Sequence, residues 1–341
     1  NKGYIMKKSA ILLSLIVTVN AQTDYALSFD GSYDYVDYGN ADSLNPRTHD
    51  YSVGLWVKTS DPNGTLFEKR LDYEIWYEAF IKDDYVVFEF TKDYPGLSYA
   101  GCTSSHLVTD GLWHYVVVVF DRDGYGTIYV DGQFSCQADI TTHAGDLVIN
   151  ASLRLGKGRY EPALNGTIDE VTIWKKALVA GEILELFKSG DELNLTSNFG
   201  DYSSSLDLVG YWRFNEGTGT TVSDASGNSN TGTIFGNANW IKPIPNPFDL
   251  VSPEKNIAIQ ITAENNWTDT LYFAWNKAVK ASTYNFAFIG DLGVLYWHLF
   301  DHCDETKLMC KIPYHRIEDL LSIEGVEIVD GSWDIIAYNG D

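Results

Sequence analysis

The chain has 341 residues, 14% aromatic side chains, 29 glycines and a formal net charge of −23 at pH 7. This length can accommodate two domains, and the aromatic and glycine content favours many short strands joined by turns over a helix bundle. The acidic charge argues against nucleic acids and anionic membranes as partners, because both require patches of Lys and Arg. It is compatible with binding of divalent cations or with solubility alone.

The first predicted element is a signal peptide that ends at Ala21. Met6-Lys7-Lys8 is a basic start, Ser9 to Val19 is an apolar run too short to span a bilayer, and Val19-Asn20-Ala21 is a small-residue cleavage site. Residues 1–21 thus comprise a few upstream residues and a leader. We expect the mature chain to be secreted or held at the cell surface, and we expect no membrane span.

Antiparallel strands are predicted through most of the first 160 residues, because apolar and polar side chains alternate with period 2. The expected strands are Tyr25 to Gly31, Tyr35 to Tyr38, Tyr51 to Lys58, Thr65 to Lys69, Tyr73 to Phe80, Tyr85 to Thr91, Trp113 to Asp121 and Gly126 to Asp131. The run Trp113 to Phe120 is apolar at nearly every position, which is typical of a central strand covered on both faces.

The stretch Asn165 to Gly190 contains a helix that is isolated in strand-rich sequence. A strand from Thr167 to Trp174 is followed, after Ala177, by apolar residues at helical spacing and a closing glycine. Simple alternation places Asp169 on the same strand face as Val171. If that face is the core face, the Asp169 carboxylate needs a hydrogen-bonding or cationic partner.

Residues 208–240 have two interpretations. The strands Leu208 to Phe214 and Gly232 to Phe235 either close the first domain or are the remnant of a second repeat. We favour closure, because a lone pair of strands is marginal by itself and a proline-rich segment follows directly. The prolines at 243, 245 and 247 cannot continue a sheet and predict a semi-rigid linker over residues 243–249.

Beyond the linker, short strands about ten residues apart predict a second, smaller sandwich over residues 250–341. Its expected elements run from a strand at Ile257 to Thr262 to one at Ser332 to Tyr338, with a helix candidate at His315 to Ser322. One strand is lacking from a complete sandwich. We therefore expect that this module is incomplete and that further chain follows Asp341.

The four cysteines are an even number in a chain predicted to be exported, where structural disulfides are the rule. Sequence order favours the pairing of Cys102 with Cys136, which flank a predicted hairpin, and of Cys303 with Cys310. Three pairings are formally possible.

Five segments in order resemble the laminin-G-like jelly-roll domains of the concanavalin A-like lectin/glucanase superfamily, which includes the pentraxins. They are Ala26 to Gly31 with Asp34 to Asp37, Tyr51 to Val57, Gly111 to Val116, Ile128 to Gly132, and Asn165 to Trp174 with Ala177-Leu178 and Glu182-Ile183. The resemblance implies an all-β antiparallel jelly-roll sandwich with one short helix over residues 22–242. Residues 250–341 more loosely resemble a fibronectin type III-like module, through Leu271 to Trp275, Tyr284 to Gly290 and Gly331 to Ile336.

A structural calcium ion is the cofactor that the sequence favours. Calcium takes six to eight oxygen ligands, and Asp30, Asn40, Asp42 and Asp169 could supply them. Jelly rolls of this family often bind calcium near the strand after the Phe-Asp-Gly turn, so the resemblance implies Asp30 and Asp169 as ligands. In the alternative, Asp30 caps a turn and Asp169 accepts backbone N–H groups. The Asp224 to Asn230 loop could likewise be a cation site or a set of Asx turns.

No catalytic residues are predicted. Glucanases of this superfamily carry their carboxylates as E-x-D-x-x-E, and this string is absent. In Tyr73 to Glu78, alternation places Glu74, Trp76 and Glu78 on one face, which could hold a sugar or be an ordinary exposed strand face.

The predicted function is therefore an exported, non-catalytic recognition module that binds a glycan or a cell-surface protein. Two alternatives remain open at this point. One is a spacer in a large adhesin with no ligand of its own, and the other is a degenerate glycoside hydrolase that uses Glu74 or Glu78.

Overall fold

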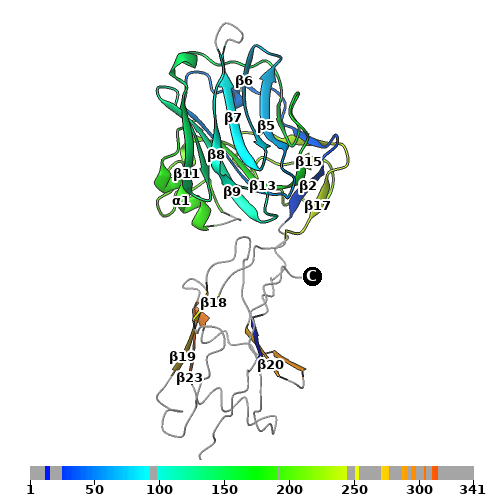
Figure 1. The fold of residues 1–341 in the computed structure, drawn as a ribbon, viewed down its shortest axis with the longest axis vertical. Coiled ribbons are helices and arrows are strands. Elements are labelled where there is room, and N and C mark those ends of the chain that lie inside the picture. The colour runs from blue at the N-terminus through cyan, green and yellow to red at the C-terminus, as the bar shows by residue number, and fades with distance from the viewer. Residues whose placement is uncertain are drawn as a thin grey trace, which may run out of the picture. The chain divides into compact units, whose positions relative to one another are not determined.

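The computed structural model describes residues 25–92, 98–189 and 193–243 in full, and elsewhere only the backbone of short strands. The chain divides into two compact units, each described by itself (Figure 1). One unit is Thr23–Pro243. The other combines Asn1–Gln22 with Ile244–Asp341.

Two eight-stranded antiparallel sheets form the Thr23–Pro243 unit (Figure 1). Sheet I has the order β11-β10-β9-β4-β13-β2-β17, with β14 also paired to β13. Its strands are β2 (Ala26–Asp30), β4 (Tyr51–Lys58), β9 (Trp113–Phe120), β10 (Tyr125–Val130), β11 (Gln133–Asp139), β13 (Asn165–Trp174), β14 (Leu208–Trp212) and β17 (Asn239–Ile241).

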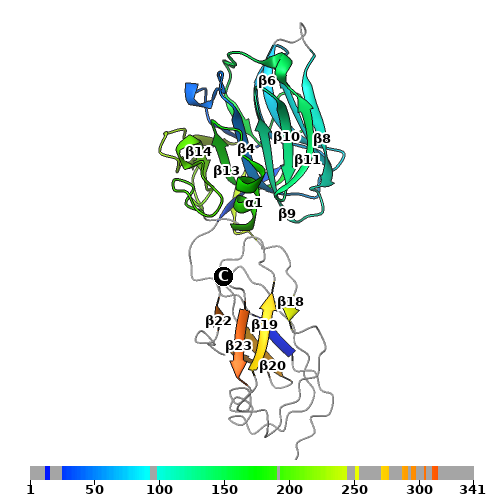
Figure 2. The ribbon, with the colours of Figure 1, turned by 90° about the vertical axis from the view of Figure 1, so that its left-hand side faces the viewer.

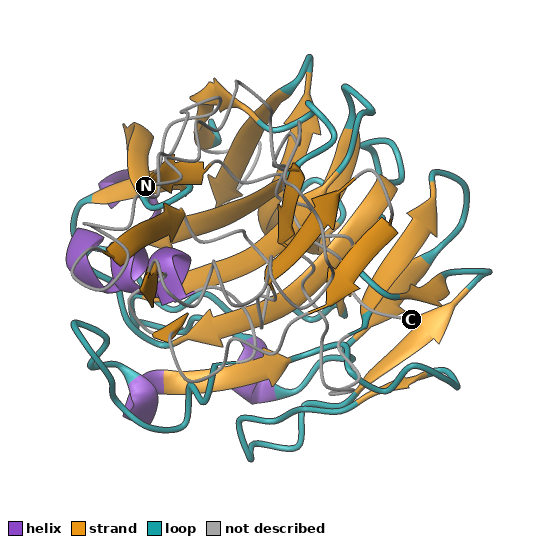
Figure 3. Ribbon diagram, turned by 90° about the horizontal axis from the view of Figure 1, so that it is seen from below, coloured by secondary structure: helices purple, strands orange, loops and turns teal. Residues whose placement is uncertain are grey.

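Sheet II has the order β15-β16-β3-β12-β5-β6-β7-β8. Its strands are β3 (Tyr35–Asp37), β5 (Gly64–Leu71), β6 (Ile75–Lys82), β7 (Tyr85–Thr91), β8 (Ala100–Leu107), β12 (Leu153–Leu155), β15 (Thr221–Val222) and β16 (Gly232–Phe235). Helical structure among these residues is limited to α1 (Ala180–Ser189) and the short turns η1 (Asp42–Leu44), η2 (Thr141–His143) and η3 (Ser205–Asp207) (Figure 3).

The core lies between the two sheets and follows from the alternation in each strand. On β4, Val53, Leu55 and Val57 face the core, and on β5 and β6 the inward side chains include Phe67 and Tyr77. Burying these aliphatic and aromatic side chains is the main favourable term in folding. The predicted all-β jelly-roll sandwich with a single α-helix is therefore confirmed for this unit.

Residues 208–241 close the first unit. Strand β14 pairs with β13, β16 pairs with β3, and β17 pairs with β2. The segment thus fills positions in both sheets, and the interpretation as closure is correct.

Helix α1 covers the outer face of sheet I, in front of β4 and β13 (Figure 2). Its Ile183 and Leu186 are buried, and the ring of Phe187 lies 5.8 Å from that of Trp56 on β4. The helix begins at Ala180, later than the sequence suggests. The Val179 N–H donates to the Glu182 carboxylate at 3.2 Å, which is a first-turn cap.

The predicted disulfide between Cys102 and Cys136 is present. Cys102 lies on β8, an edge strand of sheet II, and Cys136 lies on β11, an edge strand of sheet I. The bond therefore joins the two sheets at one side of the sandwich, where the strands have no further partners.

Replacing both Cys102 and Cys136 by serine should lower the free energy of unfolding. The bond closes a loop of sequence separation 34, and a loop of this size corresponds to roughly 2–4 kcal/mol of lost unfolded-state entropy. Urea denaturation of the full chain measures the effect. Addition of dithiothreitol to the wild type should lower its stability by at least this amount; a wild type indifferent to reductant contradicts the prediction.

The second unit contains two small antiparallel sheets. One has the order β1-β20-β21, from β1 (Leu12–Leu15), β20 (Phe286–Gly290) and β21 (Gly293–Tyr296). The other has the order β18-β19-β23-β22, from β18 (Leu250–Ser252), β19 (Thr270–Trp275), β22 (Cys303–Asp304) and β23 (Met309–Pro313). In this register Cys303 is opposite Cys310, which is compatible with their predicted pairing.

Several predictions about the second unit are not tested. The linker after Pro243, the strands Ile257 to Thr262 and Ser332 to Tyr338, and the helix candidate His315 to Ser322 lie outside the described residues. The fibronectin type III-like module and the signal peptide remain predictions. None of the helices in the described residues has the length and hydropathy that crossing a bilayer requires.

Candidate functional site

The outer face of sheet II carries a row of three glutamates. Glu68 on β5 is opposite Glu78 on β6, and Glu78 is opposite Glu89 on β7. Their neighbours along each strand point into the core, so alternation directs the three carboxylates away from it. The sequence analysis missed this row, because its members come from three strands and share no local motif.

The glutamate row is covered by the loop of residues 156–163, between β12 and β13. The Arg159 N–H donates to both carboxylate oxygens of Glu68, at 3.0 and 2.9 Å. Thr65 anchors the loop, accepting from the Gly158 N–H at 3.0 Å and donating to the Pro162 carbonyl at 2.8 Å. Glu78 is consequently only 2% exposed, and a polymeric substrate cannot reach its carboxylate.

Electrostatics in the row favour proton uptake. Burial raises the pKa of Glu78 to about 9, with a further contribution from Glu68 and an opposing one from Arg70. Burial also raises the pKa of Glu89. One guanidinium, Arg70, lies 2.5 Å from a Glu78 oxygen and is itself buried. One cation faces three carboxylates, so the electrostatics of the row favour a proton on Glu78.

The three residues predicted to bind ligand do not form one exposed face. Glu74 is exposed, but it lies in the turn between β5 and β6, before β6 begins at Ile75. Trp76 and Glu78 share a face of β6 and are buried. The Arg70 guanidinium carbon lies 3.8 Å from the centre of a Trp76 ring, so this indole packs against a cation beneath the surface.

Two tyrosines above this region are exposed and stacked. Tyr73 and Tyr160 are 55% and 42% exposed, and their ring centres lie 4.5 Å apart at an angle of 25°. Arg70 lies 4.9 Å from the Tyr160 ring centre, and Arg159 forms an ion pair of 2.7 Å with Asp72. We call these five residues platform A.

Platform A combines aromatic faces with paired charged groups at the surface. Such faces pack against the C–H groups of a sugar ring, and the Arg159–Asp72 pair supplies hydrogen-bond donors and acceptors for hydroxyl groups. Tyr73 was within the predicted segment. Tyr160 and Arg159 were missed, because only the loop fold brings residues 87 positions apart into contact.

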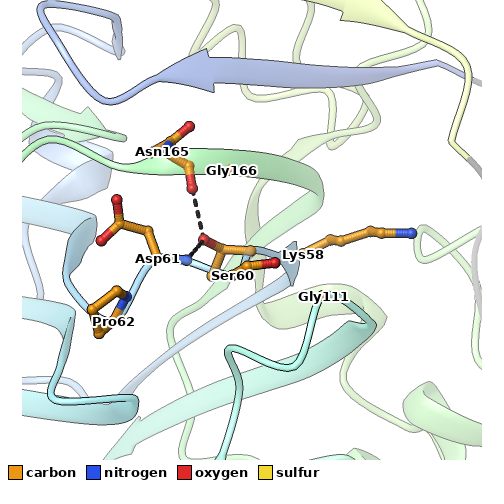
Figure 4. Close-up of a pocket in the computed structure, with 8 residues that line it drawn as sticks. Lys58, Ser60, Asp61, Pro62, Gly111, Asn165 and Gly166 are labelled. Carbon is orange, nitrogen blue, oxygen red and sulfur yellow. Dashed lines mark hydrogen bonds between the residues drawn. The ribbon is translucent and has the colours of Figure 1, made fainter.

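A shallow pocket of about 440 Å³ lies at the start of β13 (Figure 4). It is lined by Lys58, Thr59, Ser60, Asp61, Pro62, Gly111, Asn165 and Gly166. Thr59 shapes it: its hydroxyl donates to the Asn165 carbonyl at 2.6 Å and accepts from the Asp61 N–H at 2.9 Å (Figure 4). The pocket contains none of the predicted site residues and no exposed aromatic ring.

The structure separates Asp30 from Asp169. Asp30 ends β2 opposite Asn165, and its Oδ1 accepts the Ser32 N–H at 2.9 Å, an Asx turn. Asp169 is four residues further along β13, roughly 13 Å away by strand geometry, and is fully buried. These two carboxylates cannot share one metal ion.

The other two predicted calcium ligands face cations of the protein itself. Asn40 Oδ1 accepts from Lys69 Nζ at 2.8 Å, and the same ammonium donates to the Ala151 carbonyl at 2.6 Å. Burial lowers the pKa of Lys69 to about 8, with Asp37 and Asp42 opposing the change. Asp42 pairs with Arg47 at 2.7 Å. No group of three or more acidic, His or Cys side chains in the described ranges is arranged to hold a metal ion.

Asp169 lies on a different face from the one that simple alternation predicts. Ile168 faces the core, and Asp169 is paired with Trp56 on the opposite face of sheet I. At Glu170 the backbone adopts φ 50°, and the register shifts, so that Val171 returns to the core. A β-bulge at Glu170 therefore makes the prediction that Asp169 and Val171 share a face wrong. Asp169 accepts the Glu170 N–H at 2.8 Å.

The Asp224 to Asn230 loop is held by Asx-type hydrogen bonds. Asp224 accepts the N–H groups of Tyr211 at 3.0 Å, Ser226 at 2.9 Å and Asn230 at 2.9 Å. The carboxylate thus organises the backbone of the loop, which favours the turn interpretation over a cation site.

Comparison with known families supports the resemblance for part of the chain. Residues 30–184 match the family model described as the concanavalin A-like lectin/glucanases superfamily. No curated protein matches the chain.

Three solved structures match the chain at low sequence identity and with TM-scores below 0.5. A Bacteroides ovatus protein proposed to bind carbohydrate has a TM-score of 0.49 at 15% identity, over 64% of this chain and 60% of that one. Mouse laminin α1 domains LG4-5 have a TM-score of 0.38 at 18% identity, over 48% and 46%. Domain 4 of a GH43 extracellular arabinanase from Geobacillus stearothermophilus, in complex with arabinotriose, has a TM-score of 0.38 at 19% identity, over 51% of this chain and 86% of that one. The chain thus spans under two thirds of the first two proteins, and these likenesses concern the fold.

Proposed function

We propose that the Thr23–Pro243 unit is a non-catalytic glycan-binding module and that platform A is its binding surface. The observation that carries the proposal is the exposed, stacked pair Tyr73 and Tyr160 beside the Arg159–Asp72 ion pair. Aromatic rings at a surface lose little conformational entropy on binding and contact the apolar faces of sugars. The family match over residues 30–184 supports a recognition role in general.

Burial of Glu68 and Glu78 supports binding without hydrolysis. Hydrolysis by retaining glycosidases requires two carboxyl groups that flank the scissile bond. Here the Arg159 N–H of the 156–163 loop binds Glu68, Glu78 is 2% exposed, and the Arg70 side chain that pairs with Glu78 is 7% exposed. Among the three residues predicted to bind ligand, Glu74 is the exposed one. It lies in the turn before β6 and is not paired with any of the three glutamates of the row.

Export of the mature chain is part of the proposal. It is supported by the leader-like residues 6–21 and by the Cys102–Cys136 disulfide, since such bonds persist in oxidising compartments. A glycan or glycoconjugate ligand is consistent with that location.

Binding of the full chain to a glycan array tests the function. For a bound glycan, Tyr73→Ala and Tyr160→Ala should each weaken binding roughly tenfold, the loss expected for one aromatic contact of about 1.4 kcal/mol. Tyr125→Ala is the matched control, because Tyr125 is a similarly exposed tyrosine on β10 in the other sheet. EDTA should leave binding unchanged. Absence of binding to every glycan, or equal loss in all three variants, refutes the proposal.

A further inference from the structure

A second group of aromatic side chains lies on the same outer face of sheet II. Tyr35 on β3 and Phe235 on β16 stack with ring centres 4.9 Å apart and an angle of 11°. Phe235 is 44% exposed, and the Arg154 guanidinium on β12 lies 5.1 Å from the Tyr35 ring centre. Val36 and Leu155 face the core, so Tyr35 and Arg154 face outward, as the glutamate row does.

Tyr33 extends this second group toward the covering loop. Its ring is 75% exposed, and the Lys157 ammonium lies 4.1 Å from the ring centre. Lys157 belongs to the same loop that carries Tyr160 of platform A. We call Tyr33, Tyr35, Arg154, Lys157 and Phe235 platform B.

The two platforms are too far apart for a single sugar ring to contact both. By register, Tyr35 lies level with Gly156, whose N–H donates to the Leu66 carbonyl on β5. Tyr73 lies just beyond the end of β5 at Leu71, five residues further along. This corresponds to roughly 17 Å along the strand, in addition to the spacing of the intervening strands. A ligand that contacts both platforms must be an extended chain.

The charges on the platforms are largely compensated. Arg154 pairs with Asp37 at 3.4 Å, and Arg159 pairs with Asp72 at 2.7 Å. Arg70 is buried against Glu78. Around these pairs the chain has a net charge of −23, which repels polyanions at long range. Three of the four platform cations thus face a carboxylate, and the fourth, Lys157, lies against the Tyr33 ring, so the surface is better suited to hydroxyl groups than to sulfate or carboxylate groups.

We infer that platforms A and B together bind the interior of one extended, uncharged polysaccharide chain. This inference rests on the proposed function and adds the class of ligand. The 156–163 loop links the platforms, because it contributes Lys157 to one and Arg159 and Tyr160 to the other. Once a polysaccharide is bound at one platform, binding at the other is intramolecular. Both platforms therefore contribute to affinity only when the polysaccharide is long enough to reach both.

Affinity electrophoresis of the full chain in gels that contain soluble β-glucan, xylan, mannan, arabinan, alginate or pectate tests the charge class. At least one neutral polysaccharide should retard the wild type, and added NaCl should leave that retardation unchanged. Retardation by the uronate polymers alone, abolished by salt, overturns the inference in favour of a polyanion ligand.

Oligosaccharides of increasing length from the bound polysaccharide test the two-platform geometry by calorimetry. The affinity of the wild type should rise with oligosaccharide length. In Tyr33→Ala and Phe235→Ala the affinity should stop rising at a shorter length than in the wild type. Ligands short enough to occupy platform A alone should bind those variants with wild-type affinity. Leu206→Ala is the control, since Leu206 is an exposed apolar residue away from both sheets' strands.

The results separate the inference from the function on which it depends. If Tyr73→Ala and Tyr160→Ala weaken binding while Tyr33→Ala and Phe235→Ala leave long chains unaffected, platform A binds alone and the inference is wrong. If no glycan binds the wild type, the proposed function itself is wrong. Loss of long-chain affinity at both platforms, at least fivefold each, supports the inference.

Discussion

Glu182→Ala is expected to lower the free energy of unfolding by about 1–3 kcal/mol, the effect of leaving a buried hydrogen-bonding group without its partner. Glu182 is 1% exposed on the first turn of α1. One of its oxygens, Oε1, accepts the Ser203 N–H at 3.0 Å, the Ser203 hydroxyl at 2.9 Å and the Ser204 hydroxyl at 2.5 Å. Removing the carboxylate leaves the buried Ser204 hydroxyl without this acceptor, whereas the donors of the exposed Ser203 can turn to water.

The Glu182 carboxylate joins three segments of chain. Besides the serines before η3, it accepts the Val179 N–H at the start of α1 and lies 3.4 Å from the Lys176 ammonium at the end of β13. Helix α1 in turn covers Trp56 on sheet I. Loss of Glu182 should therefore loosen the helix as well as the 203–207 segment.

The effect should depend on pH. Burial raises the pKa of Glu182, but the hydrogen bonds from Ser204, Ser203 and Val179 outweigh it, and the net pKa is lowered. A carboxyl group with a lowered folded-state pKa contributes stability above its ordinary pKa of 4.5 and loses it as the pH falls through the folded value. The difference between wild type and Glu182→Gln should thus shrink in acid.

Urea denaturation between pH 3 and pH 7 measures this difference. Lys188→Ala is the matched control, because Lys188 is an exposed residue on the last turn of the same helix. The Lys188→Ala substitution should lower the free energy of unfolding by well under about 1 kcal/mol at every pH. Equal destabilisation by Glu182→Gln and Lys188→Ala at pH 7 would exclude the network as a major source of stability.

Much of the fold could be predicted from the sequence. Alternation identified strands in both sheets, such as β4, where Val53, Leu55 and Val57 face the core, but it did not identify β8, β11 or β12. The change to helical spacing after Ala177 identified α1, and the order of cysteines identified the bond between Cys102 and Cys136. Each of these patterns lies within a short stretch of sequence, which is enough to predict a single strand or helix.

The departures have physical causes that alternation does not contain. A β-bulge such as that at Glu170 inserts one residue and reverses the faces that follow, so Asp169 appeared to share the core face with Val171. The bulge residue has a positive φ, which glutamate rarely adopts, and no turn-forming residue at 170 signals it.

The candidate site was predicted only in part. Tyr73 to Glu78 led to the correct region of sheet II, but the binding surface there depends on Tyr160 and Arg159, which a loop between other strands delivers. The predicted calcium ligand Asn40 instead contacts Lys69, a residue that reads as an ordinary strand position in the sequence. Contacts between distant segments decide both cases, and one sequence does not display them.

Glu78→Gln is expected to stabilise the protein at alkaline pH, an unusual result for removal of a buried charged residue. The folded-state pKa of Glu78 is raised by burial to about 9, against an ordinary value of 4.5. A proton on Glu78 therefore contributes stability that is fully present below pH 4.5 and is lost as the pH rises toward 9. Glutamine has the shape of the protonated acid and cannot ionise.

The gain should reach up to about 5 kcal/mol at pH 8, since each unit between the ordinary pKa and the pH is about 1.4 kcal/mol, and should approach zero at pH 4. Urea denaturation of wild type and variant from pH 4 to pH 9 measures it. Glu74→Gln is the control, because this exposed glutamate precedes the same strand; it should track the wild type. If Glu78→Gln instead destabilises by a constant amount across this range, Glu78 is ionised and paired with Arg70 throughout. The glutamate row would then hold no proton, and the raised pKa of its central member would be refuted, while the stacked tyrosines above it would be untouched by the result.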